Sequence, residues 1–185
     1  MLAAALTALV GLAIYANFAT GIRVMKKLTQ PSTDAGAYIF FEKFSRDLEN
    51  AFLYNGIPFH GEKEKLSFAT TILTETPLGG ERGIGRVTYL YESGRNSLGR
   101  AQEDLNQIYK NEEASARPIL DEIYSLTFRY YKYNAKDKVY LWKDEWDEEE
   151  EENKNPVAVR IEFEFRDEEG RHSSVKTIAI PSAGQ

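Results

Sequence analysis

The stretch "AYIFFEKFSRDLENAF" (residues 37–52) combines aromatic and charged residues in a pattern with helical spacing. Its apolar positions follow one another at intervals of three and four residues and so share one helix face: Phe41, Phe44, Leu48 and Phe52. On the outer face, charged residues four positions apart can form ion pairs: Glu42 with Arg46, and Lys43 with Asp47. The sequence therefore predicts an amphipathic helix whose apolar face packs against the rest of the fold.

The residues that precede this helix form an apolar segment without charge. Residues 1–22, "MLAAALTALVGLAIYANFATGI", contain no charged side chain, and the run Leu2–Ile22 has 21 residues. Because a helix crosses the bilayer core in about 20 residues, this segment is long enough to span a membrane. A cleavable signal peptide and a buried helix of a soluble domain are alternatives, but a signal peptide starts with basic residues and none precedes Leu2. A membrane anchor is the favoured interpretation.

The helical pattern continues beyond the apolar segment. An apolar stripe extends to Leu28, and "TQPSTDAG" (residues 29–36) then interrupts it, because Pro31 disfavours a regular helix. We therefore expect residues 1–53 to form one long helix with a kink near Pro31. Three basic residues follow the apolar segment and, by the positive-inside rule alone, would place the C-terminal part in the cytoplasm: Arg23, Lys26 and Lys27.

The remainder of the chain is rich in β-strand patterns. The clearest is "PVAVRIEFEF", in which apolar and polar residues alternate so that one face is dry and the other charged. Alternation of this kind predicts strands over residues 65–73, 84–93, 125–133, 138–146, 156–165 and 174–180. The strands at 125–133 and 138–146 should form a hairpin. A glycine-rich turn is expected at 76–85, and only a short helix around Leu105 and Ile108 is suggested within the polar segment 94–118.

These patterns predict an α+β protein in which a long N-terminal helix packs on an antiparallel β-sheet domain. Residues 1–36 are expected to form the membrane-spanning part, and residues 37–185 the folded domain. The net charge of -6 argues against a nucleic-acid partner, which would normally require a basic surface. The absence of cysteine excludes disulfides, cysteine zinc sites and thiol catalysis.

No catalytic or cofactor site stands out among the polar residues. His60 and His172 are the only histidines, neither lies in a recognisable motif, and both are predicted in surface loops. The acidic run at residues 144–152 packs eight carboxylates into nine residues, but it lacks the spaced ligands and the glycine of a calcium-binding loop. We expect a solvated loop there rather than a metal site, and we expect no cofactor and no small-molecule substrate.

The order of these segments resembles that of type IV pilin-like proteins, and most closely the J-type minor pseudopilins of type II secretion. The resemblance is carried by "LVGLAIYANFATGIRVMKKL" (9–28), "FEKFSRDLENAF" (41–52), "LSFATT" (66–71), "GIGRVTYLYESG" (83–94), "ILDEIYSLTFRYY" (119–131), the pair Trp142 and Trp146, "NPVAVRIEFEF" (155–165) and "TIAIP" (177–181). The proline followed by Ala-Val-Arg and an apolar alternation is its most specific part. The family also has a basic leader and an early glutamate; no leader is matched, and Thr7 stands at the glutamate's position.

The resemblance implies a non-catalytic subunit at the tip of a short periplasmic filament, the pseudopilus. Before assembly, its N-terminal helix would span the bacterial inner membrane once, with the C-terminal domain in the periplasm. During assembly the helix would enter the filament core. Its implied partners are other minor pseudopilins, in a heteromeric tip complex, and the major pseudopilin. Four residues of the helix would then pack against neighbouring subunits: Leu6, Val10, Ile14 and Phe18.

Two further interpretations remain open at this stage. A minor pilin of a type IV pilus or competence system would share the same helix and sheet, but it would serve a different machine. A membrane-anchored periplasmic binding module would use exposed aromatic side chains, for which Trp142 and Trp146 are the natural candidates. An enzyme is the least favoured class, because no nucleophile and base are found in a recognisable arrangement.

Overall fold

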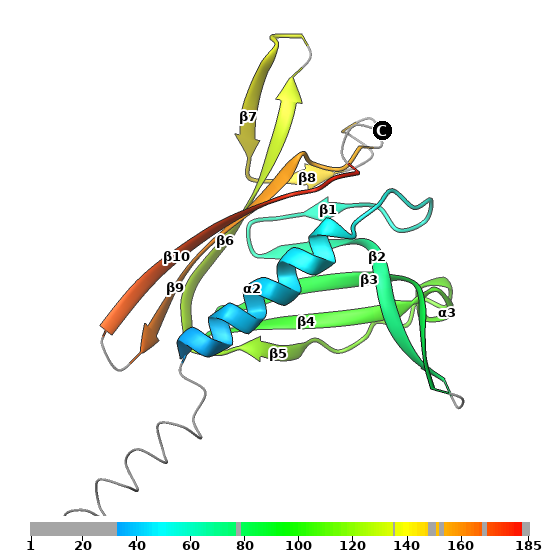
Figure 1. The fold of residues 1–185 in the computed structure, drawn as a ribbon, viewed down its shortest axis with the longest axis horizontal. Coiled ribbons are helices and arrows are strands. Elements are labelled where there is room, and N and C mark those ends of the chain that lie inside the picture. The colour runs from blue at the N-terminus through cyan, green and yellow to red at the C-terminus, as the bar shows by residue number, and fades with distance from the viewer. Residues whose placement is uncertain are drawn as a thin grey trace, which may run out of the picture.

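The computed structural model describes residues 33–76, 79–134, 136–147, 151, 154–167 and 170–182. Over these ranges the chain forms two antiparallel sheets and a helix, α2 (Thr33–Glu49), that lies across both (Figure 1). The predicted antiparallel sheet domain is therefore confirmed. The predicted helix over residues 1–32, with Leu6, Val10, Ile14 and Phe18, lies outside the described residues. Among the helices that the structure describes, none combines the length and the apolar character needed to cross a bilayer.

The first sheet has the strand order β5-β4-β3-β2-β1-β8. Its strands are β1 (His60–Gly61), β2 (Lys65–Thr76), β3 (Gly79–Glu92), β4 (Ser97–Asp104), β5 (Arg117–Leu120) and β8 (Trp146–Asp147). The short helix α3 (Leu105–Tyr109) follows β4 directly and confirms the helix expected around Leu105 and Ile108. A reciprocal capping box starts α3, because the Asp104 side chain accepts from the Gln107 amide and the Gln107 side chain accepts from the Asp104 amide.

The second sheet has the strand order β10-β9-β6-β7. Its strands are β6 (Ile123–Asn134), β7 (Val139–Lys143), β9 (Ala158–Asp167) and β10 (Gly170–Ala179). The predicted hairpin of β6 and β7 is confirmed, with Tyr131 opposite Trp142. Beyond Tyr131, β6 no longer pairs with β9, so the end of the hairpin projects away from the body of the domain (Figure 1).

Two predictions in the first sheet are wrong. The glycine-rich segment 76–85 is not a turn-rich loop, because β2 and β3 pair continuously from Lys65 opposite Leu90 to Thr76 opposite Gly79. The polar segment 94–118 contains two strands that the sequence did not predict, β4 and the beginning of β5. Both errors concern strands with glycine or polar residues where an alternating apolar pattern was expected.

The helix also differs from its predicted extent. It begins at Thr33, so residues 33–36 are helical instead of interrupting the helix, and it crosses the predicted domain boundary between residues 36 and 37. It ends at Glu49 and not near residue 53, because Asn50 donates to the Arg46 carbonyl and Ala51 donates to the Leu48 carbonyl as the chain turns away. Thr70 of β2 holds this end by donating to the carbonyls of Asp47 and Asn50.

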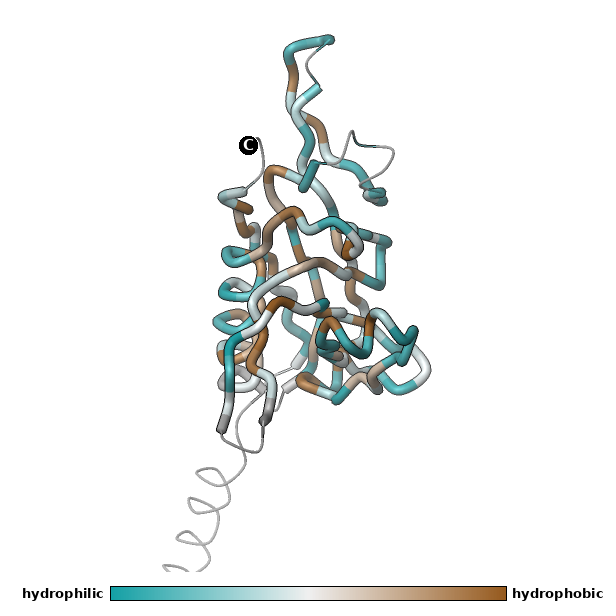
Figure 2. Tube along the Cα trace, turned by 90° about the vertical axis from the view of Figure 1, so that its right-hand side faces the viewer, coloured by the Kyte–Doolittle hydropathy of each residue, from teal (hydrophilic) through white to brown (hydrophobic). Residues whose placement is uncertain are grey.

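A single aromatic core joins the helix to both sheets. The Phe44 ring is fully buried and packs edge-to-face on Tyr89 of β3, at 5.0 Å between centroids, and against Phe128 of β6 at 5.9 Å. In Figure 2, α2 runs along one side of the domain with its hydrophilic turns directed outward. The helix therefore closes the space between the sheets with one face and presents the other to its surroundings.

Candidate functional site

The buried face of α2 overlaps the predicted one but has a different edge. Phe44 and Leu48 are fully buried, and they are joined by Ala37 and Phe40, which the sequence analysis did not select. Phe41 is half-buried instead, with its ring 5.3 Å from that of Phe163. Phe52 lies beyond the end of the helix, half-buried, with its ring 6.3 Å from that of Tyr54.

The outward face of α2 leaves large apolar side chains uncovered near its N-terminal end. Tyr38 is 67% exposed and Ile39 is 64% exposed, although both directly follow the buried Ala37. Adjacent exposed apolar side chains on a helix are typical of a surface that packs against another chain. Tyr38 also shares a helical stripe with Glu42, Ser45 and Glu49, since these positions are spaced by three and four residues.

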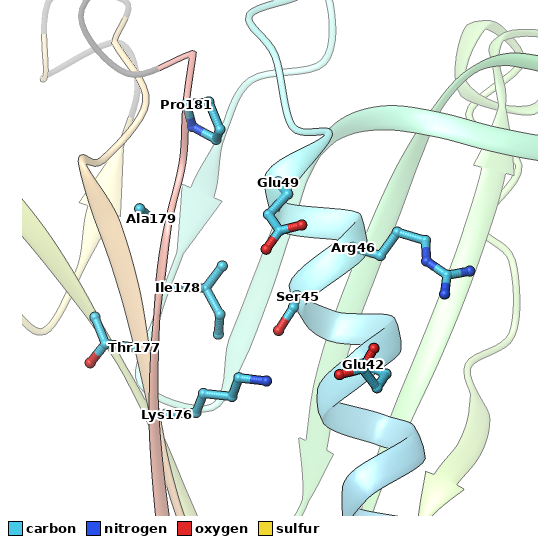
Figure 3. Close-up of a pocket in the computed structure, with 9 residues that line it drawn as sticks. All are labelled: Glu42, Ser45, Arg46, Glu49, Lys176, Thr177, Ile178, Ala179 and Pro181. Carbon is cyan, nitrogen blue, oxygen red and sulfur yellow. The ribbon is translucent and has the colours of Figure 1, made fainter.

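A groove separates this stripe from strand β10, as Figure 3 shows. Its volume is about 520 Å³, and its lining residues are Glu42, Ser45, Arg46, Glu49, Lys176, Thr177, Ile178, Ala179 and Pro181. The Ser45 hydroxyl oxygen is buried and has no hydrogen-bond partner within the described residues. Strand β10 forms one end of the described second sheet, and a strand at the edge of a sheet has backbone groups that another chain can pair with. We call this the α2–β10 groove.

On the opposite flank of α2, Asp47 anchors the helix to the first sheet. Its Oδ2 atom accepts a hydrogen bond from the Tyr89 hydroxyl at 2.7 Å and another from Arg100 Nε at 2.8 Å. The side chains of Asp47 and Arg100 are only 12% and 11% exposed. Burial, together with the Asp47 carboxylate, raises the pKa of Tyr89 well above its usual value, so the hydroxyl remains a donor. The predicted Lys43–Asp47 pair is wrong for the described residues, because Asp47 points inward to Arg100.

Part of the acidic run folds back onto the second sheet. Glu151 is 5% exposed, and its carboxylate is paired with the ammonium groups of Lys132 and Lys143. Asp144 is half-exposed and is paired with Lys63 at 3.3 Å and with Arg129 at 3.1 Å. The prediction of a solvated loop is therefore wrong for Glu151, whereas Asp144 lies exposed outside the strands, as predicted. Residues 148–150 and 152 lie outside the described residues, and the described ranges contain no group of three histidine or carboxylate side chains able to hold a metal ion.

The two tryptophans lie in different surroundings. Trp146 is 3% exposed and donates through its indole nitrogen to the Lys154 carbonyl at 3.1 Å, so the prediction that it forms an exposed platform is wrong. Trp142 is half-buried in an aromatic row on the β6–β7 hairpin, 4.6 Å from the ring of Tyr131, with the Arg160 guanidinium 4.2 Å above it. A cation over an indole face stabilises this packing.

The histidines lie in strands and not in loops. His60 is part of β1 and its Nε2 atom is 3.2 Å from Glu62 Oε1. His172 is part of β10, with its ring 5.6 Å from that of Phe165. The prediction that the two histidines lie in loops is therefore wrong for both.

The buried Glu151 should make stability depend on acid pH. Burial opposes its ionisation, but the hydrogen bonds from Lys132 and Lys143 outweigh burial and lower the pKa of Glu151 below 4.5. The pair therefore stabilises the fold fully above about pH 4.5, and this contribution is lost as the pH falls through the lowered pKa. At pH 7 we expect Glu151→Gln to lower the free energy of unfolding by about 2 kcal/mol.

Urea unfolding followed by tryptophan fluorescence at pH 7 and pH 3 checks this prediction. The variant should lose less stability than the wild type on acidification. The free energies of unfolding of the two proteins should therefore become similar at low pH. Glu145→Gln is the matched control, because Glu145 is exposed in the same segment and has no described ion pair. Equal acid sensitivity of the Glu151 variant and the wild type would contradict the assignment.

Comparison with known proteins identifies the class. The chain, whose helix packs across antiparallel sheets, matches the family model "Type II secretion system (T2SS), protein J". The match covers residues 37–173, more than half of the 185-residue chain. The chain belongs to the type II secretion system protein J family, and the resemblance to J-type minor pseudopilins is confirmed. The match begins within α2 and ends within β10. A search of curated proteins finds no match.

Proposed function

We propose that this protein is a non-catalytic minor pseudopilin at the tip of the type II secretion pseudopilus, where it supports protein export across the outer membrane. Its membership of the protein J family supports a role in the secretion system. The proposal adds an N-terminal anchor in the bacterial inner membrane, formed within residues 1–36, and a C-terminal domain, residues 37–185, in the periplasm. The length and apolar character of residues 1–22 support the anchor.

The exposed apolar residues of α2 are the observation that carries this proposal. Tyr38 and Ile39 lie uncovered at the end of the helix that follows the apolar segment, whereas Phe44 and Leu48 are sealed in the core. A helix with an uncovered apolar face gains free energy when neighbouring helices cover it. In a filament, the neighbours would be the corresponding helices of other subunits.

Other minor pseudopilins and the major pseudopilin are the partners that this proposal requires. The α2–β10 groove offers them a second contact beside the helix, because it combines a helix flank with the edge of the second sheet. Further toward the N-terminus, Leu6, Val10, Ile14 and Phe18 would pack in the filament core. Their spacing of four residues gives one stripe that can face a neighbouring helix.

A charge within the filament-core stripe tests the proposal. Val10→Glu should abolish secretion when the variant replaces the wild-type protein in cells, because a carboxylate in the bilayer or in a packed bundle is costly. Secretion of an exported enzyme and recovery of the pseudopilin complex from detergent-solubilised membranes are the measurements. Val139→Glu is the matched control, because Val139 is 49% exposed at the β6–β7 hairpin and should tolerate the charge. Normal secretion with Val10→Glu would overturn the proposed assembly role.

A further inference from the structure

A second groove lies on the flank of α2 that faces the first sheet. Its volume is about 650 Å³, larger than the α2–β10 groove. Residues from α2, β2, β4, α3, the segment after α3 and β5 line it: Lys43, Ile72, Leu73, Thr74, Arg100, Gln102, Asp104, Gln107, Ala114, Ser115, Arg117 and Ile119. We call it the α2–β4 groove.

Beside the groove, the lining residue Ile72 packs over a glycine of the middle strand β3. Gly85 of β3 lies between Thr70 of β2 and Asp104 of β4 in the register of the sheet. A side chain at Gly85 would collide with Ile72 and with the backbone of Glu103, so only glycine allows this close packing. Gln102 reaches across to β2 and donates to the Leu73 carbonyl at 2.7 Å.

The lining carries an excess of positive charge in a chain whose net charge is -6. Lys43, Arg100 and Arg117 contribute three cations, whereas Asp104 is the acidic residue of the lining and its carboxylate is occupied in capping α3. Asp47 lies next to the groove, pairs directly with Arg100 and also attracts the Lys43 ammonium. Within the described ranges, neither Lys43 nor Arg117 forms a direct ion pair with a carboxylate. Partial burial and the nearby Arg100 lower the pKa of Lys43 more than Asp47 raises it.

We propose that the α2–β4 groove binds a carboxylate-bearing peptide segment of a partner protein, a role that goes beyond the assembly function proposed above. Guanidinium and ammonium groups at Arg117 and Lys43 would hold the carboxylates. Ile119 adds apolar surface, and an amide side chain, Gln102, also lines the groove. This mixture suits an extended peptide, and the groove is much larger than a lone phosphate ion requires.

Direct binding of acidic probe peptides tests the inference. The full-length protein in detergent micelles is titrated into a fluorescent peptide of alternating valine and glutamate, and anisotropy is read at low ionic strength with empty micelles as the blank. Saturable binding is expected, together with at least about tenfold weaker binding of the corresponding valine–glutamine peptide, because partly desolvated charge pairs contribute strongly to affinity. Equal binding of the two peptides would overturn the proposal.

Substitutions of Lys43 and Arg117 test whether the peptide binds in the groove. Lys43→Gln combined with Arg117→Gln should weaken binding of the acidic peptide about tenfold or more. The matched control, Lys65→Gln with Arg95→Gln, removes the same charge at exposed positions outside the lining and should bind like the wild type. Unchanged binding by the groove variant, or equal losses in both variants, would overturn the assignment.

Inorganic phosphate separates a peptide site from a simple anion site. Added at the same concentration as the acidic peptide, phosphate should leave most of the peptide bound, because it cannot use the apolar part of the groove. Complete displacement at that concentration would identify an anion site and overturn the peptide assignment. These binding results are independent of the secretion readout for Val10→Glu, so failure of one proposal can be told from failure of the other.

Discussion

Replacing Phe44 by alanine is expected to lower the free energy of unfolding by about 3–5 kcal/mol, the range found when a buried phenylalanine is truncated. Phe44 has no exposed surface, and its ring contacts Phe40, Tyr89 and Phe128 from the helix and from both sheets. Truncation would therefore remove apolar burial and leave a cavity at the point where three parts of the fold meet. Urea unfolding of the full-length protein, followed by tryptophan fluorescence, measures the loss.

Tyr38→Ala provides the matched comparison on the same helix. Tyr38 is 67% exposed, so its truncation should change the free energy of unfolding by no more than about 0.5 kcal/mol. If the outward face of α2 contacts partner subunits, the same substitution should nevertheless reduce recovery of the pseudopilin complex from membranes. A Phe44→Ala protein as stable as Tyr38→Ala would contradict the described core.

The second large effect is expected at Asp47. Asp47→Ala would leave the Arg100 guanidinium and the Tyr89 hydroxyl without their shared acceptor, in a site where both paired side chains are nearly buried. Breaking one half of a buried ion pair typically costs about 3–5 kcal/mol, because the remaining charge stays desolvated. We expect a loss of about 3 kcal/mol in urea unfolding, at the lower end because a little solvent reaches the pair.

A double substitution distinguishes the unpaired charge from lost packing. Asp47→Ala combined with Arg100→Met removes the isolated guanidinium, so it should recover a large part of the stability lost in the single variant. Such non-additivity is the signature of two groups that interact directly. Asp121→Ala, at an exposed position, should have little effect and serves as the control. Strictly additive losses would show that Asp47 and Arg100 do not depend on each other.

The amphipathic helix shows which residues of its buried face can be predicted from helical periodicity and which cannot. A stripe through Phe41, Phe44, Leu48 and Phe52 and a stripe through Ala37, Phe40, Phe44, Leu48 and Ala51 are both compatible with helical spacing. The two share Phe44 and Leu48, which could be predicted, but adjacent phenylalanines at 40 and 41 make the edge of the face ambiguous. Both rings contact Phe163, but only Phe40 also packs on Tyr89 and is buried, and such contacts arise only in the folded chain.

Strand β4 could not be predicted for a related reason. Its inward positions include Arg100 and Gln102, which are polar because they serve the Asp47 pair and the α2–β4 groove. An apolar alternation is therefore absent where the strand faces inward. Strand β9, in contrast, alternates fully because its inward residues Val159, Ile161 and Phe163 are buried in the apolar core, and the sequence predicted it correctly.

The buried charges escape sequence analysis because their partners are distant in the chain. Glu151 lies in a run of acidic residues whose composition predicts a solvated segment. Its sequence neighbours give no indication that it is buried. Its partners Lys132 and Lys143 are brought to it by the β6–β7 hairpin. Asp47 and Arg100 are likewise 53 residues apart. Charge pairing of this kind follows from topology and not from spacing.

The placement of α2 across both sheets has a mechanical consequence. The helix contacts β2 and β5 of the first sheet and β9 and β10 of the second, through side chains directed away from its axis. A force that pulls on the Thr33 end along the axis therefore loads these side-chain contacts and the Asp47–Arg100 pair in shear, and it reaches both sheets together. Strands are not peeled away one hydrogen bond at a time. The domain should travel as a rigid body behind its N-terminal segment, with its orientation set by the axis along which it is pulled.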